Sequence, residues 1–231
     1  MKSHHAVSDI SRIKNELSSS ELMVRINPWN VGSTNEINAV IDAGADVIML
    51  PMWKTVNEVK LFLDSVGKRA HTNLLLETKE AINCLDEVLK LDGIDEIHIG
   101  LNDLHLSYGM TFMFEVLSDG IIEKTCKKIS SYGIPYGFGG IAKLGYGDLP
   151  AERIITEHYR LGSSAAILSR SFCNYEEIHD VNVIDDLFRI NMKALREFEI
   201  KAAGFSEEEF ENNRKEVCRL TSEIVKKRRE R

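Results

Sequence analysis

Six short runs of aliphatic and β-branched residues recur along this 231-residue chain, and a helical pattern separates most of them from the next. Several runs are almost entirely apolar, which is typical of parallel strands that are covered on both faces. A repeated strand–helix order predicts a parallel sheet with right-handed crossovers. The predicted strands are Met23–Asn27, Asp46–Leu50, Asn73–Glu77, Glu96–Gly100, Ile134–Gly139 and Ala165–Ser169.

The segments between the strands carry helical periodicity and helix-ending glycines. Gly133 and Gly162 each follow an amphipathic segment, at the position where a left-handed residue commonly ends a helix. The predicted helices are Asn35–Ala43, Thr55–Val66, Lys79–Leu91, Ile121–Ser131 and Pro150–Leu161.

No dinucleotide-binding glycine fingerprint follows the first strand, which favours a TIM-type (β/α) barrel over an open, doubly wound sheet. Such a barrel has eight strands, whereas six are visible here behind one short helix, Val7–Leu17. We therefore expect an α/β barrel domain over residues 1–180 that is truncated at its N-terminus. Two long helices, Val183–Ala202 and Ser206–Arg229, predict a C-terminal helical extension over residues 181–231.

Composition and charge narrow the class of partner. The formal net charge is −7, and the basic run Lys226–Arg229 is predicted to be a solvated helix end, so we expect no nucleic-acid partner. No apolar run is long enough to span a bilayer, and the N-terminus has no hydrophobic signal core. We expect a cytoplasmic protein without a membrane partner. The four cysteines are far apart in sequence, which predicts free thiols.

Two carboxylates stand at the ends of neighbouring predicted strands, where barrel enzymes carry their working residues. Glu77 follows three leucines, and Asp103 follows the next strand along the chain. A carboxylate that ends a buried strand needs a cation or donors, and adjacent strands lie about 5 Å apart. Oxygen ligands suit Mg²⁺ or Mn²⁺, so we predict a metal site. The alternative is that each carboxylate caps a helix.

Two further strand ends offer anion-binding groups. Arg25 interrupts an apolar strand, and it would bind a carboxylate or an enolate oxygen; the alternative is a structural ion pair. The glycine-rich segment Gly137–Gly140 predicts a flexible strand-end loop in which Gly139 and Gly140 let backbone N–H groups approach a substrate. The alternatives for this segment are a tight turn, or a phosphate-binding loop in a sugar enzyme.

Four stretches carry a family resemblance: VRINP, AGADVIMLP, LLLETKEA and HIGLNDLHLSYG. They resemble the HpcH/HpaI aldolase/citrate lyase family, closely over Met23–Asp103 and more loosely to about Ser171. The resemblance implies that Glu77 and Asp103 bind the metal and that Arg25 contacts the substrate keto acid and its enolate. It also implies that backbone amides of Leu101, Asn102 and Asp103 lie near the substrate carboxylate.

The resemblance implies a Mg²⁺-dependent carbon–carbon lyase or aldolase that acts on a 2-keto acid or an acyl ester of the acyl-CoA type through a metal-stabilised enolate. It also suggests a homo-oligomer. Three features depart from the family pattern: an early acidic strand is absent, no histidine base matches, and Met52 stands where citrate-lyase-like members usually have lysine. The alternative function is a catalytically silent homologue that binds metal and ligand as a scaffold.

Overall fold

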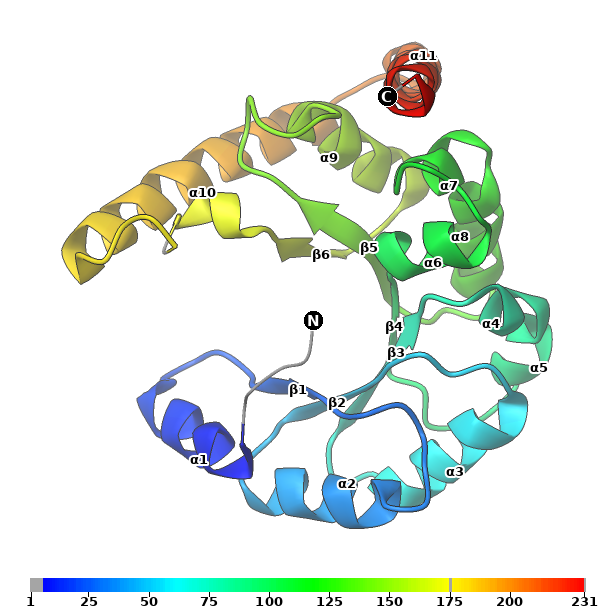
Figure 1. Cartoon of the computed structure of the whole chain (residues 1–231), viewed down its shortest axis with the longest axis vertical. Coiled ribbons are helices and arrows are strands. Elements are labelled where there is room, and N and C mark those ends of the chain that lie inside the picture. Colours follow the sequence, from blue (N-terminus) through cyan, green and yellow to red (C-terminus); the bar gives the residue numbers. More distant parts are fainter. Residues whose placement is uncertain (1–5, 175, 231) are drawn as a thin grey trace. The chain divides into compact units, whose positions relative to one another are not determined.

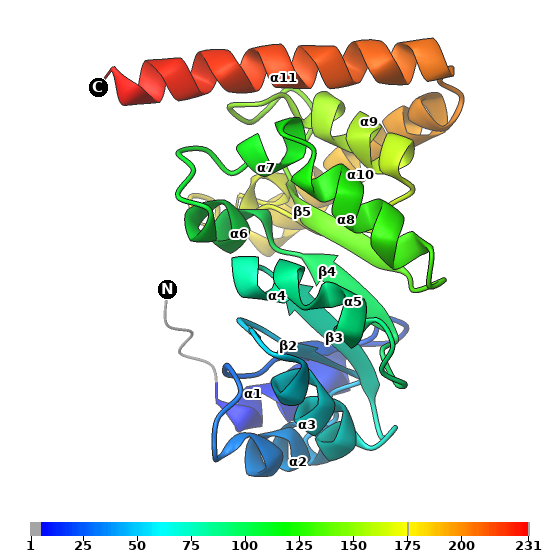
Figure 2. The same cartoon turned by 90° about the vertical axis from the view of Figure 1, so that its right-hand side faces the viewer.

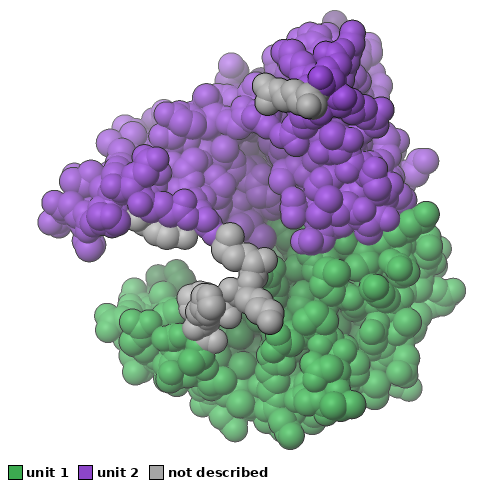
Figure 3. Space-filling view, viewed as in Figure 1, with its two compact units in different colours: residues 1–100, 128–135 green, residues 101–127, 136–231 purple. Residues whose placement is uncertain are grey.

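The computed structural model describes residues 6–174 and 176–230. The chain divides into two compact units, which are coloured separately in Figure 3. The first unit spans residues 1–100 and 128–135, and the second spans residues 101–127 and 136–231. Each unit is described by itself.

The first unit contains four strands that pair in parallel in chain order, labelled in Figure 1. Val24 pairs with Ile48, Met49 with Asn73, and Leu76 with Ile99. The middle strands are buried, as their apolar sequences predict, and Ile48, Leu50, Leu74 and Leu76 are fully buried. The strands are β1 (Met23–Arg25), β2 (Val47–Leu50), β3 (His71–Leu76) and β4 (Glu96–Ile99).

The helices of this unit follow the predicted order with one correction. Thr55 caps α3 in a reciprocal capping box with Glu58, which fixes the start of that helix. The single helix predicted over Lys79–Leu91 is wrong, because the backbone leaves the helical region at Cys84 (φ −104°, ψ 12°). The helices are α1 (Val7–Glu16), α2 (Ser33–Asp42), α3 (Val56–Val66), α4 (Lys79–Asn83) and α5 (Leu85–Val88).

The second unit contains β5 (Tyr136–Ile141) and β6 (Ala165–Leu168), which pair in parallel with a register shift between Gly137 and Gly140. The strand predicted over Ile134–Gly139 is confirmed as β5, and the flexible loop predicted over Gly137–Gly140 is wrong, because the strand continues to Ile141. The reason is close packing: a Cβ added to Gly137 would lie 2.3 Å from the carbonyl oxygen of Ala165. A Cβ on Gly139 would lie 2.7 Å from Cδ1 of Leu101.

Helices make up most of the second unit. Two short ones, α6 and α7, were not predicted, because four to seven residues are too few to show a helical period. The helix α8 begins in this unit and ends in the first. The helices are α6 (Leu101–Ser107), α7 (Glu115–Ser118), α8 (Ile121–Ser130), α9 (Ala151–Leu161), the 3₁₀ turn η1 (Arg170–Phe172), α10 (Val181–Ala203) and α11 (Glu207–Arg229).

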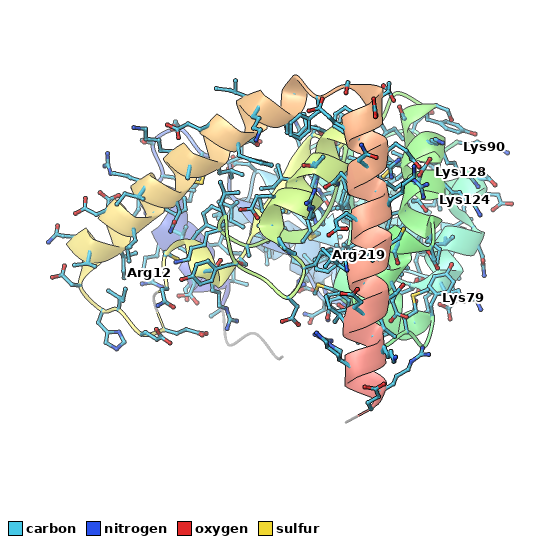
Figure 4. All side chains as sticks on the ribbon, turned by 90° about the horizontal axis from the view of Figure 1, so that it is seen from above. Arg12, Lys79, Lys90, Lys124, Lys128 and Arg219 are labelled. Carbon is cyan, nitrogen blue, oxygen red and sulfur yellow. The ribbon has the colours of Figure 1, made fainter. Side chains whose placement is uncertain are left out.

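The last helix, α11, packs along α9 and α7 (Figure 2). Its buried residues are four apart, at Asn213, Val217, Thr221 and Val225, so that they form one stripe along the helix. The opposite face carries charges such as Arg219, labelled in Figure 4, which pairs with two glutamates of the same helix. A reciprocal capping box between Ser206 and Glu209 fixes the start of this helix.

The α/β order with six strands, followed by two long helices, is confirmed. β6 differs from the buried middle strands β2 and β3, since 54% of Ile167 is exposed. The four cysteines are free thiols, and Cys126 is buried. None of the helices in the described part of the chain combines the length and the hydropathy that a membrane span needs. The division at residue 180 stays a prediction.

Candidate functional site

Glu77 lies directly after β3 and is buried, with 4% of the residue exposed. Its Oε1 accepts a hydrogen bond of 3.0 Å from the backbone nitrogen of Met52. Gly100, which follows β4, lies against the same carboxylate, because a Cβ there would be 2.9 Å from Oε2 of Glu77. The absence of a side chain at position 100 therefore leaves space for the Glu77 carboxylate.

The capping alternative for the two carboxylates is wrong. The cap of α4 is Thr78, whose hydroxyl accepts a hydrogen bond of 3.1 Å from the nitrogen of Ala81. Asp103 is the third residue of α6 and therefore lies inside that helix, in its first turn. A carboxylate in a first turn is stabilised by the helix dipole.

Arg25 is the last residue of β1, and it is exposed. It pairs in register with Met49 of β2. Within residues 6–174 and 176–230 no ion pair to Arg25 is present, which is against its reading as a structural ion pair. Its role as a substrate contact stays a prediction.

The second unit holds a cavity of about 410 Å³ at the carboxyl ends of β5 and β6. Two of the predicted substrate-binding residues line it: Asn102, in the first turn of α6, and Gly140, in β5. Ser169, directly after β6, lines it as well. The side chain of Leu101 is fully buried and packs against Gly139, and the role of its backbone amide at a substrate stays a prediction.

His105 also lines this cavity, one turn after Leu101. Its Nδ1 lies 3.3 Å from the carbonyl oxygen of Leu101. A ring nitrogen that donates to a carbonyl fixes the orientation of the imidazole on its helix. The contact therefore holds the wall of the cavity next to Asn102.

Two charged residues of the cavity were missed from the sequence. Arg228, from the last turn of α11, lies there with Asp148, from the segment after β5. Their side chains form an ion pair of 2.5 Å. The run Lys226–Arg229 was predicted to be a solvated helix end; all four residues lie in the exposed last turn of α11, and Arg228 makes this ion pair in addition. No local sequence pattern indicates this ion pair, because 80 residues separate Arg228 from Asp148.

The described residues contain no group of three or more His, Cys, Asp or Glu side chains that could hold a metal ion. A metal site with only two carboxylate ligands, completed by water and substrate oxygens, has fewer than these three side chains. Such a site is the common arrangement for Mg²⁺, which retains several waters and uses one or two carboxylates.

Comparisons with known proteins agree with the resemblance seen in the sequence. Residues 2–116 match the model of the HpcH/HpaI aldolase/citrate lyase family. Hydroxypyruvate/pyruvate aldolase of Roseobacter denitrificans is 26% identical over 167 residues, which cover 56% of this chain and 63% of that protein. The enzyme of the same name from Rhizorhabdus wittichii is 27% identical over 163 residues, covering 56% and 64%. The chain thus matches less than two thirds of either relative.

Solved structures share the fold. An HpcH/HpaI aldolase from Desulfitobacterium hafniense has a TM-score of 0.59 at 15% identity, with 80% of each chain covered. The citrate synthase SbnG has a TM-score of 0.60 at 15% identity, covering 79% of this chain and 80% of that one. Protein CitE from Mycobacterium tuberculosis, in complex with magnesium and pyruvate, reaches 0.52 at 14% identity, covering 72% and 67%.

Proposed function

Residues 2–116 belong to the HpcH/HpaI aldolase/citrate lyase family, and from this we propose that the chain is a metal-dependent carbon–carbon lyase that acts on a 2-keto acid. The observation that carries the proposal is Glu77, a buried carboxylate at the end of an apolar strand. The names of the matched relatives, hydroxypyruvate/pyruvate aldolases, support a pyruvate-type keto acid as the substrate class.

We propose Glu77 and Asp103 as the ligands of a divalent cation, Mg²⁺ or Mn²⁺. Two observations support the pair. Gly100 lies against Glu77, and only two residues separate Gly100 from Asp103. Three steps along the chain span at most about 11 Å, which two carboxylate side chains and one cation can bridge. The donors are oxygens, which suit a hard cation.

In this proposal the chain's own residues bind and orient the substrate. Arg25 is an exposed cation at a strand end and would bind the keto-acid carboxylate or the enolate oxygen. Asn102 lies beside Asp103 and lines the cavity. Backbone amides of Leu101 and Asn102, in the first turn of α6, are donors for an anionic oxygen. A bound cation would supply Lewis-acid stabilisation of developing enolate charge.

The test measures metal binding and enolisation separately. Mn²⁺ binding is followed by electron paramagnetic resonance, and exchange of the pyruvate methyl protons for deuterium is followed by NMR with Mg²⁺ present. We expect Glu77→Gln and Asp103→Asn each to weaken Mn²⁺ binding at least about tenfold and to abolish the exchange. Glu80→Gln, which neutralises an exposed carboxylate of α4, is the matched control and should change neither.

Two outcomes would contradict the proposed lyase function. If Glu77→Gln and Asp103→Asn both exchange pyruvate protons at the wild-type rate, the metal site lies elsewhere and the proposal fails. If the wild-type protein binds Mn²⁺ and pyruvate yet shows no exchange, the chain is the ligand-binding homologue instead.

A further inference from the structure

An arginine from the C-terminal helix, Arg228, lines one side of the cavity of the second unit. Resting on the proposed lyase function, we propose that this cavity binds the half of the substrate that leaves the keto acid, and that this half is an apolar group carrying a carboxylate. Arg228 would hold that carboxylate.

The walls of the cavity are suited to an apolar group. Phe112, Ile141 and Leu149 line it, and each is at least nine-tenths buried in the unit. Its few polar groups, Asn102 and Ser169 among them, come from the ends of α6 and β6. A cavity of about 410 Å³ with apolar walls and a few converging polar groups is typical of a small-molecule site.

Arg228 is held over this wall by contacts from two segments. Its Cζ lies 4.5 Å from the centre of the Phe112 ring, and its Nη1 donates to the carbonyl oxygen of Thr111 at 3.4 Å. Its Nη2 donates to Asp148 at 2.5 Å. A guanidinium has five N–H donors, and stacking on a ring fixes its plane, so donors remain for a bidentate carboxylate.

The ion pair with Asp148 is of the kind that a ligand can replace. The side chains of Arg228 and Asp148 are 40% and 63% exposed. An ion pair this exposed contributes little to stability, because water and salt screen it. A ligand carboxylate that brings its apolar body into the cavity would bind the remaining N–H donors and compete with Asp148 for the charge of the guanidinium.

The position of the cavity relates it to the proposed chemistry. Asn102, which lines it, is the residue directly before the proposed metal ligand Asp103. The cation Arg228 lies far outside residues 2–116, the part that matches the family model.

The test uses benzoate and benzamide, which have nearly the same shape and differ in charge. Binding is measured by isothermal titration calorimetry with a chelator present, so the result does not depend on the proposed metal site. We expect the wild-type protein to bind benzoate about tenfold more tightly than benzamide. Arg228→Gln should remove this preference, whereas Lys227→Gln, the loss of an equal charge next to it, should leave it unchanged.

A second variant separates a binding role from a structural one. Asp148→Asn frees Arg228 without removing it, and it should raise the affinity for benzoate about threefold. If the pair only holds α11 in place, Asp148→Asn and Arg228→Gln would lower the affinity together, and the proposal would be overturned. It would also be overturned if the wild-type protein bound both probes equally. Neither result would affect the pyruvate exchange that tests the lyase function.

Discussion

Oε1 of Glu157 accepts a hydrogen bond of 2.9 Å from the side-chain amide of Asn213, and this bond joins α9 to α11. Glu157 is 1% exposed, and its other oxygen forms an ion pair of 2.7 Å with Arg160. The same amide of Asn213 donates to the carbonyl oxygen of Arg153 at 3.0 Å. Oε1 of this buried carboxylate therefore has its amide donor only while α11 lies on α9.

Asn213→Leu should therefore destabilise the second unit. The variant leaves Oε1 of Glu157 buried without its amide donor, and an unsatisfied buried charged group costs about 2–3 kcal/mol. Urea unfolding followed by circular dichroism measures the loss. Asn212→Leu changes an exposed neighbour on the same helix and serves as the control. Equal unfolding midpoints for the two variants would show that the Glu157–Asn213 contact contributes nothing.

Gly100→Ala should perturb the proposed metal site without removing a ligand. The added Cβ would lie 2.9 Å from both Cβ and Oε2 of Glu77, so the carboxylate has to move. We expect Mn²⁺ binding to weaken about tenfold and the free energy of unfolding to fall by about 1–3 kcal/mol. Gly204→Ala, where the nearest atom is 3.5 Å away, is the control. Unchanged Mn²⁺ affinity in Gly100→Ala would argue against Glu77 as a ligand.

The stability of the first unit should depend on the ionisation of Asp46. A hydrogen bond from the backbone of Leu22, and then the ammonium of Lys14, lower the pKa of this carboxyl below its usual range. A lowered pKa contributes stability above the unfolded-state value, and this stability is lost as the pH falls through the folded-state value. Asp46→Asn should cost about 1–2 kcal/mol at pH 7 and progressively less below about pH 4.

Chemical denaturation of wild-type protein and Asp46→Asn at a series of pH values measures this difference. Asp42→Asn, an exposed carboxyl of α2, should follow the wild-type curve at every pH. A constant gap between wild type and Asp46→Asn from pH 7 to pH 3 would contradict the assignment.

The thiols should differ in reactivity. Burial raises the pKa of Cys126 to about 12, and the thiolate is the reactive form. In the native protein at pH 8, iodoacetamide should alkylate the partly exposed Cys173 at least about tenfold faster than Cys126. Peptide mass spectrometry after timed quenching compares the two. Equal rates under native conditions would show that Cys126 is accessible, whereas equal rates in urea are expected.

Local patterns were sufficient to predict the strands and most of the helices. The runs around Ile48, Leu74 and Ile97 are apolar because both faces of β2, β3 and β4 are covered, and this is visible in the sequence. The capping boxes that start α3 and α11 join Thr55 to Glu58 and Ser206 to Glu209, in each case only three positions apart. These features depend on neighbours along the chain.

The features that failed depend on distant partners. The sequence predicted both a strand and a loop at Gly137, and the approach of Ala165, 28 positions later, accounts for the glycine in the strand. In the sequence, Arg228 is one more charge in a basic helix end. Only the structure places Asp148 and Phe112 beside it. For the candidate site, the residues Glu77, Asn102 and Gly140 could be proposed from the sequence. The cavity that Arg228 lines could not, because it is formed by segments far apart in the chain.

The close approach of β5 to β6 limits which substitutions the chain tolerates in these strands. At position 137 even a methyl group would collide with the carbonyl of Ala165, so homologues that keep this strand pairing should keep glycine there. Gly145 has a positive φ, of 76°, and nothing lies within 4 Å of its missing side chain. Asparagine or aspartate is tolerated in that conformation, so substitutions of this kind should accumulate at position 145 while position 137 stays fixed.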